Sequence, residues 1–220
     1  MRKLSLVPAA VLALTFAGAA WGQTGELWFN YGRSLLQNSS LGTLSAFGGG
    51  PNDVKLDDGY RFSFRFGFNQ GSHFGHEVQY AFNHTQFDQS VSSTIGAGTG
   101  VSPITGTSST TPAKQAMHFH QGGYNFLLYA LSDKLRVRPF ATAGVQFSDF
   151  VPPGGAINYG SQNKFGANFG GGVKIHVKGI WAVRFDVREY LSGKPNFNAL
   201  TLGSGALWQT EVSAGVGVGF

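Results

Sequence analysis

The last thirteen residues of the sequence, WQTEVSAGVGVGF from Trp208 to Phe220, alternate between two kinds of residue. Even positions carry aromatic or mostly apolar residues, Thr210 being the exception, and odd positions carry polar residues or glycine. Successive side chains of a β-strand point to opposite sides, and residues two apart share a face. The stretch therefore predicts a strand with one apolar face and one polar face that continues to the final residue.

The first residues have the order of an export signal. Met1 to Lys3 is positively charged, residues 4–20 form an apolar run, and small residues precede Gln23. A membrane-spanning helix needs about 20 apolar residues, so this run is short for one. We predict a secretory signal peptide at 1–22, cut after Gly22, and one mature domain at 23–220.

Composition narrows the class of protein. No stretch after Gly22 is apolar and long enough to cross a bilayer as a helix, so a membrane role would require strands. The chain has no cysteine, 33 glycines, 20 phenylalanines and only 12% charged residues, a balance that suits contact with lipid. Removal of Arg2 and Lys3 leaves 14 basic and 11 acidic residues, and an excess of three does not indicate a nucleic-acid partner.

Seven further segments repeat the two-faced alternation. The clearest is Tyr60 to Asn69, in which aromatic residues alternate with polar residues and glycine. The predicted strands cover about 25–33, 60–69, 73–84, 116–130, 135–147, 164–177, 180–191 and 208–220. Long polar connections at 34–57, 85–115, 148–163 and 192–207 alternate with tight turns at 70–72, 131–134 and 178–179. The sequence predicts an all-β, eight-stranded antiparallel up-and-down transmembrane barrel with short periplasmic turns and long extracellular loops.

Three positions disturb the alternation. In the fourth segment Met117 and Phe119 are assigned to the outer face, and a bulge at Gly122-Gly123 would then change the phase. Pro139 cannot donate to a strand ladder, so we expect a bulge or a missing bond there. Trp28 falls on the inner face, so that either it packs in the lumen or the phase of the first strand slips by one.

The polar faces of the predicted strands carry eleven charged residues. A soluble, lipocalin-like carrier would turn these faces to water, whereas a membrane barrel turns them into a lumen just wide enough to be filled by side chains. We expect Arg65 to face Glu77 and Arg188 to face Glu211 in a network that plugs the lumen. Seven basic and four acidic inward residues would make any water path favour anions. The predicted lumen charge network comprises Glu26, Arg61, Arg65, Glu77, Arg136, Arg138, Lys174, Arg184, Asp186, Arg188 and Glu211.

Over most of Gly25 to Phe220 the chain resembles the bacterial outer-membrane eight-stranded barrels of the OmpA/OmpX type. The resemblance implies an integral protein of the bacterial outer membrane, in contact with membrane lipid and lipopolysaccharide, and we expect a monomer. Trp181 and Trp208 would belong to its aromatic girdle. We expect a structural or surface-interaction role, and the alternatives are a small anion-favouring pore, a lipid A-modifying barrel enzyme and a secreted lipocalin-like ligand carrier. The resemblance also implies recognition by the barrel assembly machinery through Val212, Val216, Val218 and Phe220.

Enzymes in this family modify lipid A, and acyl transfer there requires a histidine near a serine and a carboxylate. The sequence instead reads His118-Phe119-His120, without that serine, so we predict no catalytic residue. The two histidines share one strand face but lack a positioned third metal ligand, and we predict no metal site and no cofactor. The glycines at 48–50, 96–100 and 170–172 are not phosphate loops, and those of the last group would relieve crowding inside the barrel.

Overall fold

The computed structural model describes residues 23–44, 53–89, 113–152, 161–197, 200–202 and 205–220. The predicted signal peptide at 1–22 and the glycines at 48–50 and 96–100 lie outside these ranges. Within them, no helix has the length and hydropathy needed to span a membrane.

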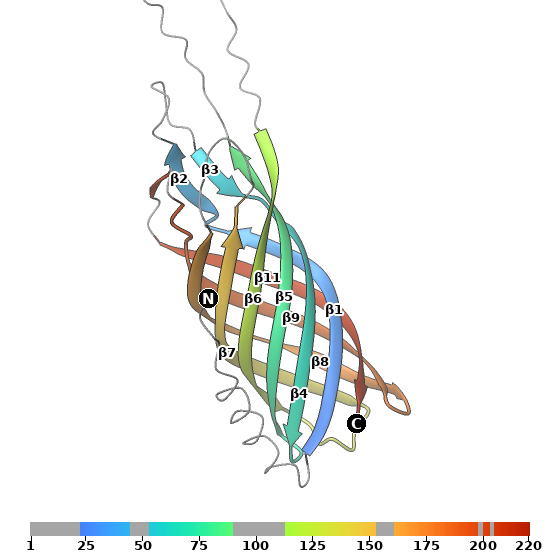
Figure 1. Cartoon of the computed structure of the whole chain (residues 1–220). Coiled ribbons are helices and arrows are strands. Elements are labelled where there is room, and N and C mark those ends of the chain that lie inside the picture. The colour runs from blue at the N-terminus through green and yellow to red at the C-terminus, as the bar shows by residue number, and fades with distance from the viewer. Residues whose placement is uncertain (1–22, 45–52, 90–112, 153–160, 198–199, 203–204) are drawn as a thin grey trace, which may run out of the picture.

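Eight long antiparallel strands close into a barrel (Figure 1). The pairing runs β1-β4-β5-β6-β7-β8-β9-β11, and β11 returns to pair with β1. Closure leaves none of these strands with a free edge along the barrel wall. The predicted fold class is therefore confirmed. The strands are β1 (Gln23–Gln37), β4 (Gly59–Gln70), β5 (Phe74–Gln89), β6 (Ala113–Tyr129), β7 (Val137–Val151), β8 (Gln162–Lys178), β9 (Trp181–Gly193) and β11 (Ala206–Gly219).

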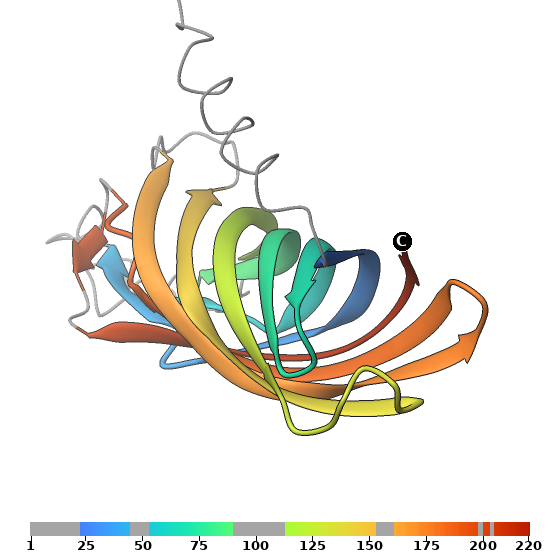
Figure 2. The same cartoon turned by 90° about the horizontal axis from the view of Figure 1, so that it is seen from below.

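The two ends of the barrel differ. The short connections at 71–73, 130–136 and 179–180 lie at one end, which we call the turn end, together with the start of β1 and the end of β11 (Figure 1). Gly71 and Gly179 adopt positive φ angles of 65° and 58°, which glycine reaches without steric cost. Seen from below, the strands form one continuous curved wall (Figure 2), and the end of β11 pairs with the start of β1. The longer connections leave from the opposite, loop end.

The loop end contains short strands, contrary to the prediction of long loops at 34–57 and 192–207. Short strands β2 (Ser40–Leu44), β3 (Asp53–Leu56) and β10 (Leu200–Leu202) extend the sheet from the upper part of β5 in the order β10-β2-β3-β5. Leu41, Val54 and Leu56 are fully or almost fully buried there. These segments were predicted as loops because their composition is polar, but they contain apolar residues that pack inward over the lumen.

The outer wall of the barrel is apolar. Phe64, Phe126 and Val145, on three different strands, keep 53%, 57% and 64% of their surface exposed. Their respective neighbours in sequence Arg65, Asn125 and Gln146 are polar or charged and are buried. This distribution is the reverse of that in a soluble ligand carrier, so the lipocalin-like alternative is wrong. It is the distribution expected of a barrel surrounded by lipid.

The predicted bulge in β6 is wrong. The pairing between β5 and β6 runs without a shift from Phe74 opposite Leu128 to Gln89 opposite Ala113, passing through Gly122 and Gly123. Met117 and Phe119 are buried on the inner face, not exposed on the outer one. The apolar residues that suggested a change of phase are instead part of an apolar interior at the loop end.

Pro139 also causes no bulge, because β7 and β8 stay in register with Pro139 opposite Val173. It lies near the first residue of β7, and its carbonyl accepts a hydrogen bond from the Ala130 amide at 3.0 Å, just beyond the end of β6. Trp28 packs in the lumen, which is the first of the two predicted alternatives, and its Nε1 donates to Glu26 Oε2 at 2.9 Å.

Candidate functional site

The lumen gathers the charged residues that the alternation predicts to be inward. Ten of the eleven are buried: Glu26, Arg61, Arg65, Glu77, Arg138, Lys174, Arg184, Asp186, Arg188 and Glu211.

Arg136 is the exception, and its prediction as a lumen residue is wrong. It is exposed and donates to the Val177 carbonyl at 2.9 Å. Its strand, β7, begins only at Val137, so the alternation had been extended into the turn. Of the predicted set, six basic and four acidic residues therefore lie in the lumen, an excess of two rather than three.

Asp186 on β9 lies at the centre of the lumen. Its carboxylate is 2.9 Å from Arg65 Nη1, 2.6 Å from Arg184 Nε and 3.0 Å from Arg188 Nη2. The short strand-to-strand distances across a narrow barrel let guanidinium groups from β4 and β9 converge on this one carboxylate. Asp186 thus holds three cations that would repel one another without it.

Two further carboxylates extend this cluster on either side. Glu211 on β11 pairs with Arg65 at 2.5 Å and with Arg61 at 3.1 Å. Glu77 on β5 pairs with Arg184 at 2.6 Å and with Arg188 at 3.0 Å. All seven side chains are at most 1% exposed, and such burial is tolerable only because each ion has an opposite charge in contact. We call this set the ionic layer: Arg61, Arg65, Glu77, Arg184, Asp186, Arg188 and Glu211.

The predicted partners within the ionic layer need correction. Arg65 lies opposite Gln79, not Glu77, and its ion pairs cross the lumen to Asp186 and Glu211. Arg188 does lie opposite Glu211 in the strand register, but the ion pairs that it makes go to Glu77 and Asp186. Long side chains in a narrow barrel reach partners across the lumen as easily as partners on the neighbouring strand.

A second polar cluster fills the lumen toward the turn end. Glu26 forms an ion pair with Lys174 and accepts hydrogen bonds from Trp28 Nε1 at 2.9 Å and Asn69 Nδ2 at 2.7 Å. Lys174 Nζ also donates to the Tyr129 hydroxyl at 2.6 Å, and that hydroxyl donates to Asn69 Oδ1 at 2.7 Å. This lower cluster is closed on itself by hydrogen bonds.

Aromatic rings fill the rest of the lumen at the turn end, and a glycine leaves space for one of them. The Arg138 guanidinium lies 3.8 Å from the centroid of the Tyr129 ring, a cation–π contact, and donates to the Ser72 carbonyl at 3.1 Å. Gly172 faces Phe140, and a Cβ added to this glycine would lie 2.8 Å from the ring. As predicted for residues 170–172, the glycine makes room for a neighbour inside the barrel.

Amide side chains form the next layer above the ionic layer. Asn83 donates to Gln121 Oε1 at 3.1 Å, and Gln121 donates to Gln209 Oε1 at 3.0 Å. Gln209 in turn donates to Asn83 Oδ1 at 2.8 Å and to Ser34 Oγ at 2.7 Å. Arg61 donates to Asn83 Oδ1 at 3.2 Å, so this amide layer is continuous with the ionic layer.

A buried apolar cluster closes the loop end and was not predicted. Within it the Phe119 and Phe150 rings stack with centroids 5.1 Å apart, and Phe87 meets Phe197 edge-on at 6.2 Å. The signal that could have found it is the inward phase of Met117 and Phe119, which a rule of polar-inside alternation rejects. We call this cluster the apolar cap: Leu36, Leu41, Val54, Leu56, Phe87, Met117, Phe119, Phe150, Phe197 and Leu207.

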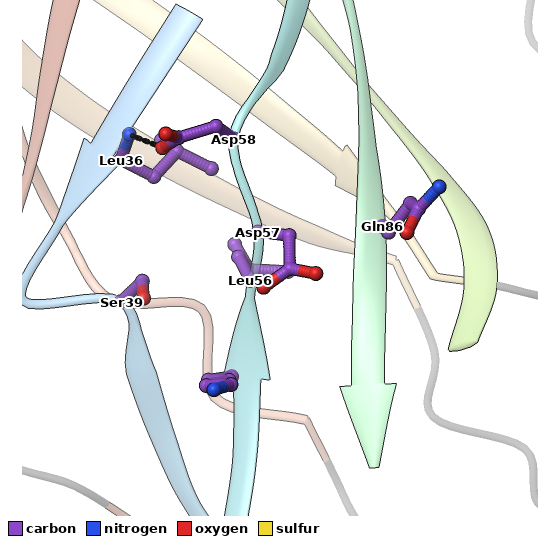
Figure 3. Close-up of a pocket in the computed structure, with 7 residues that line it drawn as sticks. Leu36, Ser39, Leu56, Asp57, Asp58 and Gln86 are labelled. Atoms are coloured by element: carbon purple, nitrogen blue, oxygen red, sulfur yellow. Dashed lines mark hydrogen bonds between the residues drawn. The ribbon is translucent and has the colours of Figure 1, made fainter. Parts of the chain in front are cut away.

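A polar recess lies beside the apolar cap, where β1 and β5 meet the bend between β3 and β4 (Figure 3). Asp58 accepts a hydrogen bond from the Leu36 amide at 2.7 Å, and Asp57 pairs with Lys114 at 2.6 Å. The hydrogen bond to Asp57 and the negative charge of that residue raise the pKa of Lys114 above its ordinary value. The lining residues are Leu36, Ser39, Lys55, Leu56, Asp57, Asp58 and Gln86.

The outer wall carries the remaining residues that the sequence singled out. Trp181 is exposed near the turn end and Trp208 near the loop end, the two levels expected of a girdle. His118 and His120 share the outer face of β6. His120 Nδ1 lies 2.7 Å from the Tyr80 hydroxyl, and His118 Nδ1 lies 3.0 Å from His84 Nδ1.

The C-terminal strand presents its proposed recognition residues outward. Val212, Val216 and Phe220 are exposed, and Val218 is partly exposed on the same face. The Phe220 and Gly25 backbones exchange two hydrogen bonds of 2.8 Å, so the last residue is tied to β1. Among the residues that the structure describes, no group of three histidine, cysteine or acidic side chains is arranged to hold a metal ion.

Comparison with known proteins gives one match to a family model and several to solved structures. The model of the outer membrane protein beta-barrel domain matches residues 8–220. The outer membrane protein OprG from Pseudomonas aeruginosa has a TM-score of 0.57 and 14% identity, over 89% of this chain and 96% of that chain. The N-terminal barrel domain of Pseudomonas aeruginosa OprF gives 0.45 and 12%, over 89% and 97%, and Neisserial surface protein A gives 0.44 and 14%, over 90% and 97%. No curated protein matched the sequence.

Proposed function

The chain belongs to the outer membrane protein beta-barrel family and is an integral protein of the bacterial outer membrane, and from this premise we propose that it is a closed, non-conducting barrel with a structural or surface-interaction role. Its turn end then faces the periplasm and its loop end the cell exterior.

The filling of the lumen is the observation that carries the proposal. From the turn end upward, the lower cluster, the ionic layer, the amide layer and the apolar cap follow one another along the barrel. The ionic layer is held by charges that are fully withdrawn from solvent. A conducting pore keeps its charged groups in water, because a permeating ion must exchange one polar partner for another at each step. Every charge of the ionic layer has an opposite charge in contact inside the lumen, and this pairing supports a plug.

The loop end supports the surface-interaction part of the proposal. Strands β2, β3 and β10 raise a small sheet above the barrel, and the recess beside β3 offers carboxylate, ammonium and amide groups (Figure 3). These features stand on a rigid scaffold, which is where binding residues concentrate in proteins. The charged groups of the recess, Lys55, Asp57 and Asp58, are not among the residues of the apolar cap.

The proposal assigns partners to the outer wall. Its apolar side chains would contact outer-membrane lipid, with lipopolysaccharide around the loop end, and the outward residues from Val212 to Phe220 would be recognised by the barrel assembly machinery. We further propose that the protein is monomeric and not an enzyme. His118 faces another imidazole and His120 a tyrosine hydroxyl, and neither contact is that of a general base with a serine nucleophile.

The test is the conductance of the refolded mature chain in planar bilayers. Protein that shifts in gel mobility when boiled is folded, and we expect this species to insert without a steady current. An open porin studied in the same bilayers controls for insertion. A steady anion-selective current from the heat-modifiable species would contradict the closed lumen and would favour the small-pore alternative.

A further inference from the structure

Two histidines meet on the outer wall, away from the lumen. His84 on β5 and His118 on β6 are directly opposite each other in the strand register. Their Nδ1 atoms are 3.0 Å apart, and both side chains are partly exposed. Neither residue takes part in the plug. The pair therefore needs an account of its own.

The pair lies at the external edge of the apolar band. His84 comes ten positions after Phe74, the first residue of β5 at the turn end. A rise of about 3.3 Å per residue and a strand tilt of about 40° place it about 25 Å above Phe74, which is the height of the apolar band of such barrels. Gln86, the next outward side chain on β5, is polar and exposed, and on β6 the exposed Lys114 follows Ala116 on the same face. Ions from the external medium can reach this level.

The separation of the two nitrogens matches a metal chelate. Two imidazole nitrogens, each about 2.0 Å from a shared metal ion and 3.0 Å from each other, subtend about 95° at that ion. Neighbouring ligands in a square-planar or tetragonal complex subtend about 90°, whereas a tetrahedral ion would require the nitrogens about 3.3 Å apart. At 3.0 Å the two nitrogens are within hydrogen-bond distance of each other and are also at the spacing of neighbouring ligands in a tetragonal complex, the preference of Cu(II) and Ni(II).

Neighbouring rings hold the two imidazoles in place. The Tyr60 ring lies 4.8 Å from that of His84, and the Phe82 ring lies 5.2 Å from that of His118. His120, two residues along β6, contacts the Tyr80 hydroxyl through its Nδ1 atom. The described residues supply two ligands and no suitably placed third one, so water would complete the coordination.

We propose that His84 and His118 form a two-histidine surface site for a divalent metal ion of tetragonal geometry, Cu(II) foremost, at the external edge of the barrel wall. This inference does not depend on the closed lumen or on the proposed surface-interaction role.

The test is a Cu(II) titration of the tag-free, refolded barrel, followed by electron paramagnetic resonance. We expect one tetragonal Cu(II) per barrel with two imidazole nitrogens in its pulsed spectrum. His84→Ala and His118→Ala should each leave one imidazole on the metal ion. Each should weaken Cu(II) binding by at least roughly 10–100-fold, which is the loss that follows when a residue supporting a metal ligand is removed. His76→Ala is the matched control, because His76 lies on the same face of β5 as His84 and its Nδ1 atom contacts a tyrosine hydroxyl, that of Tyr124, and not a second imidazole.

Gel mobility with and without boiling reports folding of every variant separately from metal binding. If the double variant His84→Ala, His118→Ala is folded and still binds one Cu(II) through two imidazoles, the proposal is wrong. It is equally wrong if His76→Ala or His120→Ala weakens binding as much as His118→Ala does. A folded wild-type barrel that binds no Cu(II) with two imidazoles would also overturn it.

Discussion

The ionic layer and the apolar cap fill the same lumen by different physical means. In the ionic layer, each of seven buried charges depends on a particular opposite charge, and Asp186 alone contacts three arginines. In the apolar cap, ten side chains from several segments exclude water by area and shape, and no single contact is indispensable. The difference teaches that one barrel can be closed by specific pairing at its middle and by non-directional burial at its mouth.

Removal of Asp186 tests the dependence on pairing and should have the largest effect. In Asp186→Ala, four buried arginines of the ionic layer share two carboxylates, and a stranded buried charge costs about 3–5 kcal/mol. We expect that loss in the free energy of unfolding, measured by urea titration in lipid vesicles with tryptophan fluorescence. The loss should persist in roughly 1 M salt, because buried pairs are screened little.

The control for this substitution is Asp149→Ala. Asp149 is an aspartate of β7 that is partly exposed, and its removal should change the free energy of unfolding by less than about 0.5 kcal/mol. Equal losses in the two variants would mean that the ionic layer does not depend on Asp186.

A substitution in the apolar cap should have a similar or somewhat smaller effect on stability and none on conductance. Phe119 is almost fully buried against Phe150, and Phe→Ala substitutions in cores cost about 3–5 kcal/mol. We expect the lower end for Phe119→Ala, because the cap lies at the mouth of the barrel and can relax. Bilayer recordings should stay silent, since the ionic layer below is unchanged.

Phe126→Ala on the lipid-facing wall is the matched control, and lipid chains can fill the space that it leaves. A steady current in Phe119→Ala, absent from Phe126→Ala, would mean that the cap and not the ionic layer closes the lumen. That result would reverse the ranking of the two regions.

In the lower cluster, substitution can replace a charge pair directly by uncharged side chains. Lys174→Met should cost about 2–3 kcal/mol, below the full range for a stranded ion, because Trp28 and Asn69 still donate to Glu26. Adding Glu26→Gln removes the stranded charge, so the double variant should return to within about 1 kcal/mol of the wild type. Urea unfolding of the four members of this cycle gives the coupling energy. If the double variant is no more stable than Lys174→Met, the barrel needs the ion pair itself, and avoiding a stranded charge is not sufficient.

The same contrast explains how far the sequence could predict the molecule. Strand phase follows from local alternation, and so the strands, the polar lumen and the inward Trp28 could be predicted without knowledge of neighbours. The partners of Arg65 could not, because they depend on the width and stagger of the closed barrel, which set which side chains meet across the lumen. Arg136 was misplaced because alternation does not say where a strand ends.

The apolar cap escaped prediction for a further reason. Met117 and Phe119 are apolar residues on an inward face, and a rule that assigns apolar residues to lipid must either move them outward or introduce a bulge. The correct alternative, an apolar interior near the mouth, requires β2 and β3 to cover it. Those strands lie in segments whose glycine, serine and asparagine content is typical of loops.

The exposed ion pair between Lys114 and Asp57 should contribute least, which sharpens the contrast between buried and exposed charge. The pKa of Lys114 is raised by its hydrogen bond to Asp57 and by the charge of Asp57, so the folded barrel holds this proton more tightly than the unfolded chain. The resulting stability is present below the ordinary lysine pKa of 10.5 and is lost as pH rises through the higher folded value. Lys114→Met should therefore lower the urea midpoint only slightly at neutral pH, and the two midpoints should converge above the folded pKa. Water screens the exposed pair of Lys114 and Asp57 but does not reach the buried pair of Lys174 and Glu26. If Lys114→Met lowers the stability at neutral pH as much as Lys174→Met does, burial does not determine how much a charge pair contributes to the stability of this barrel.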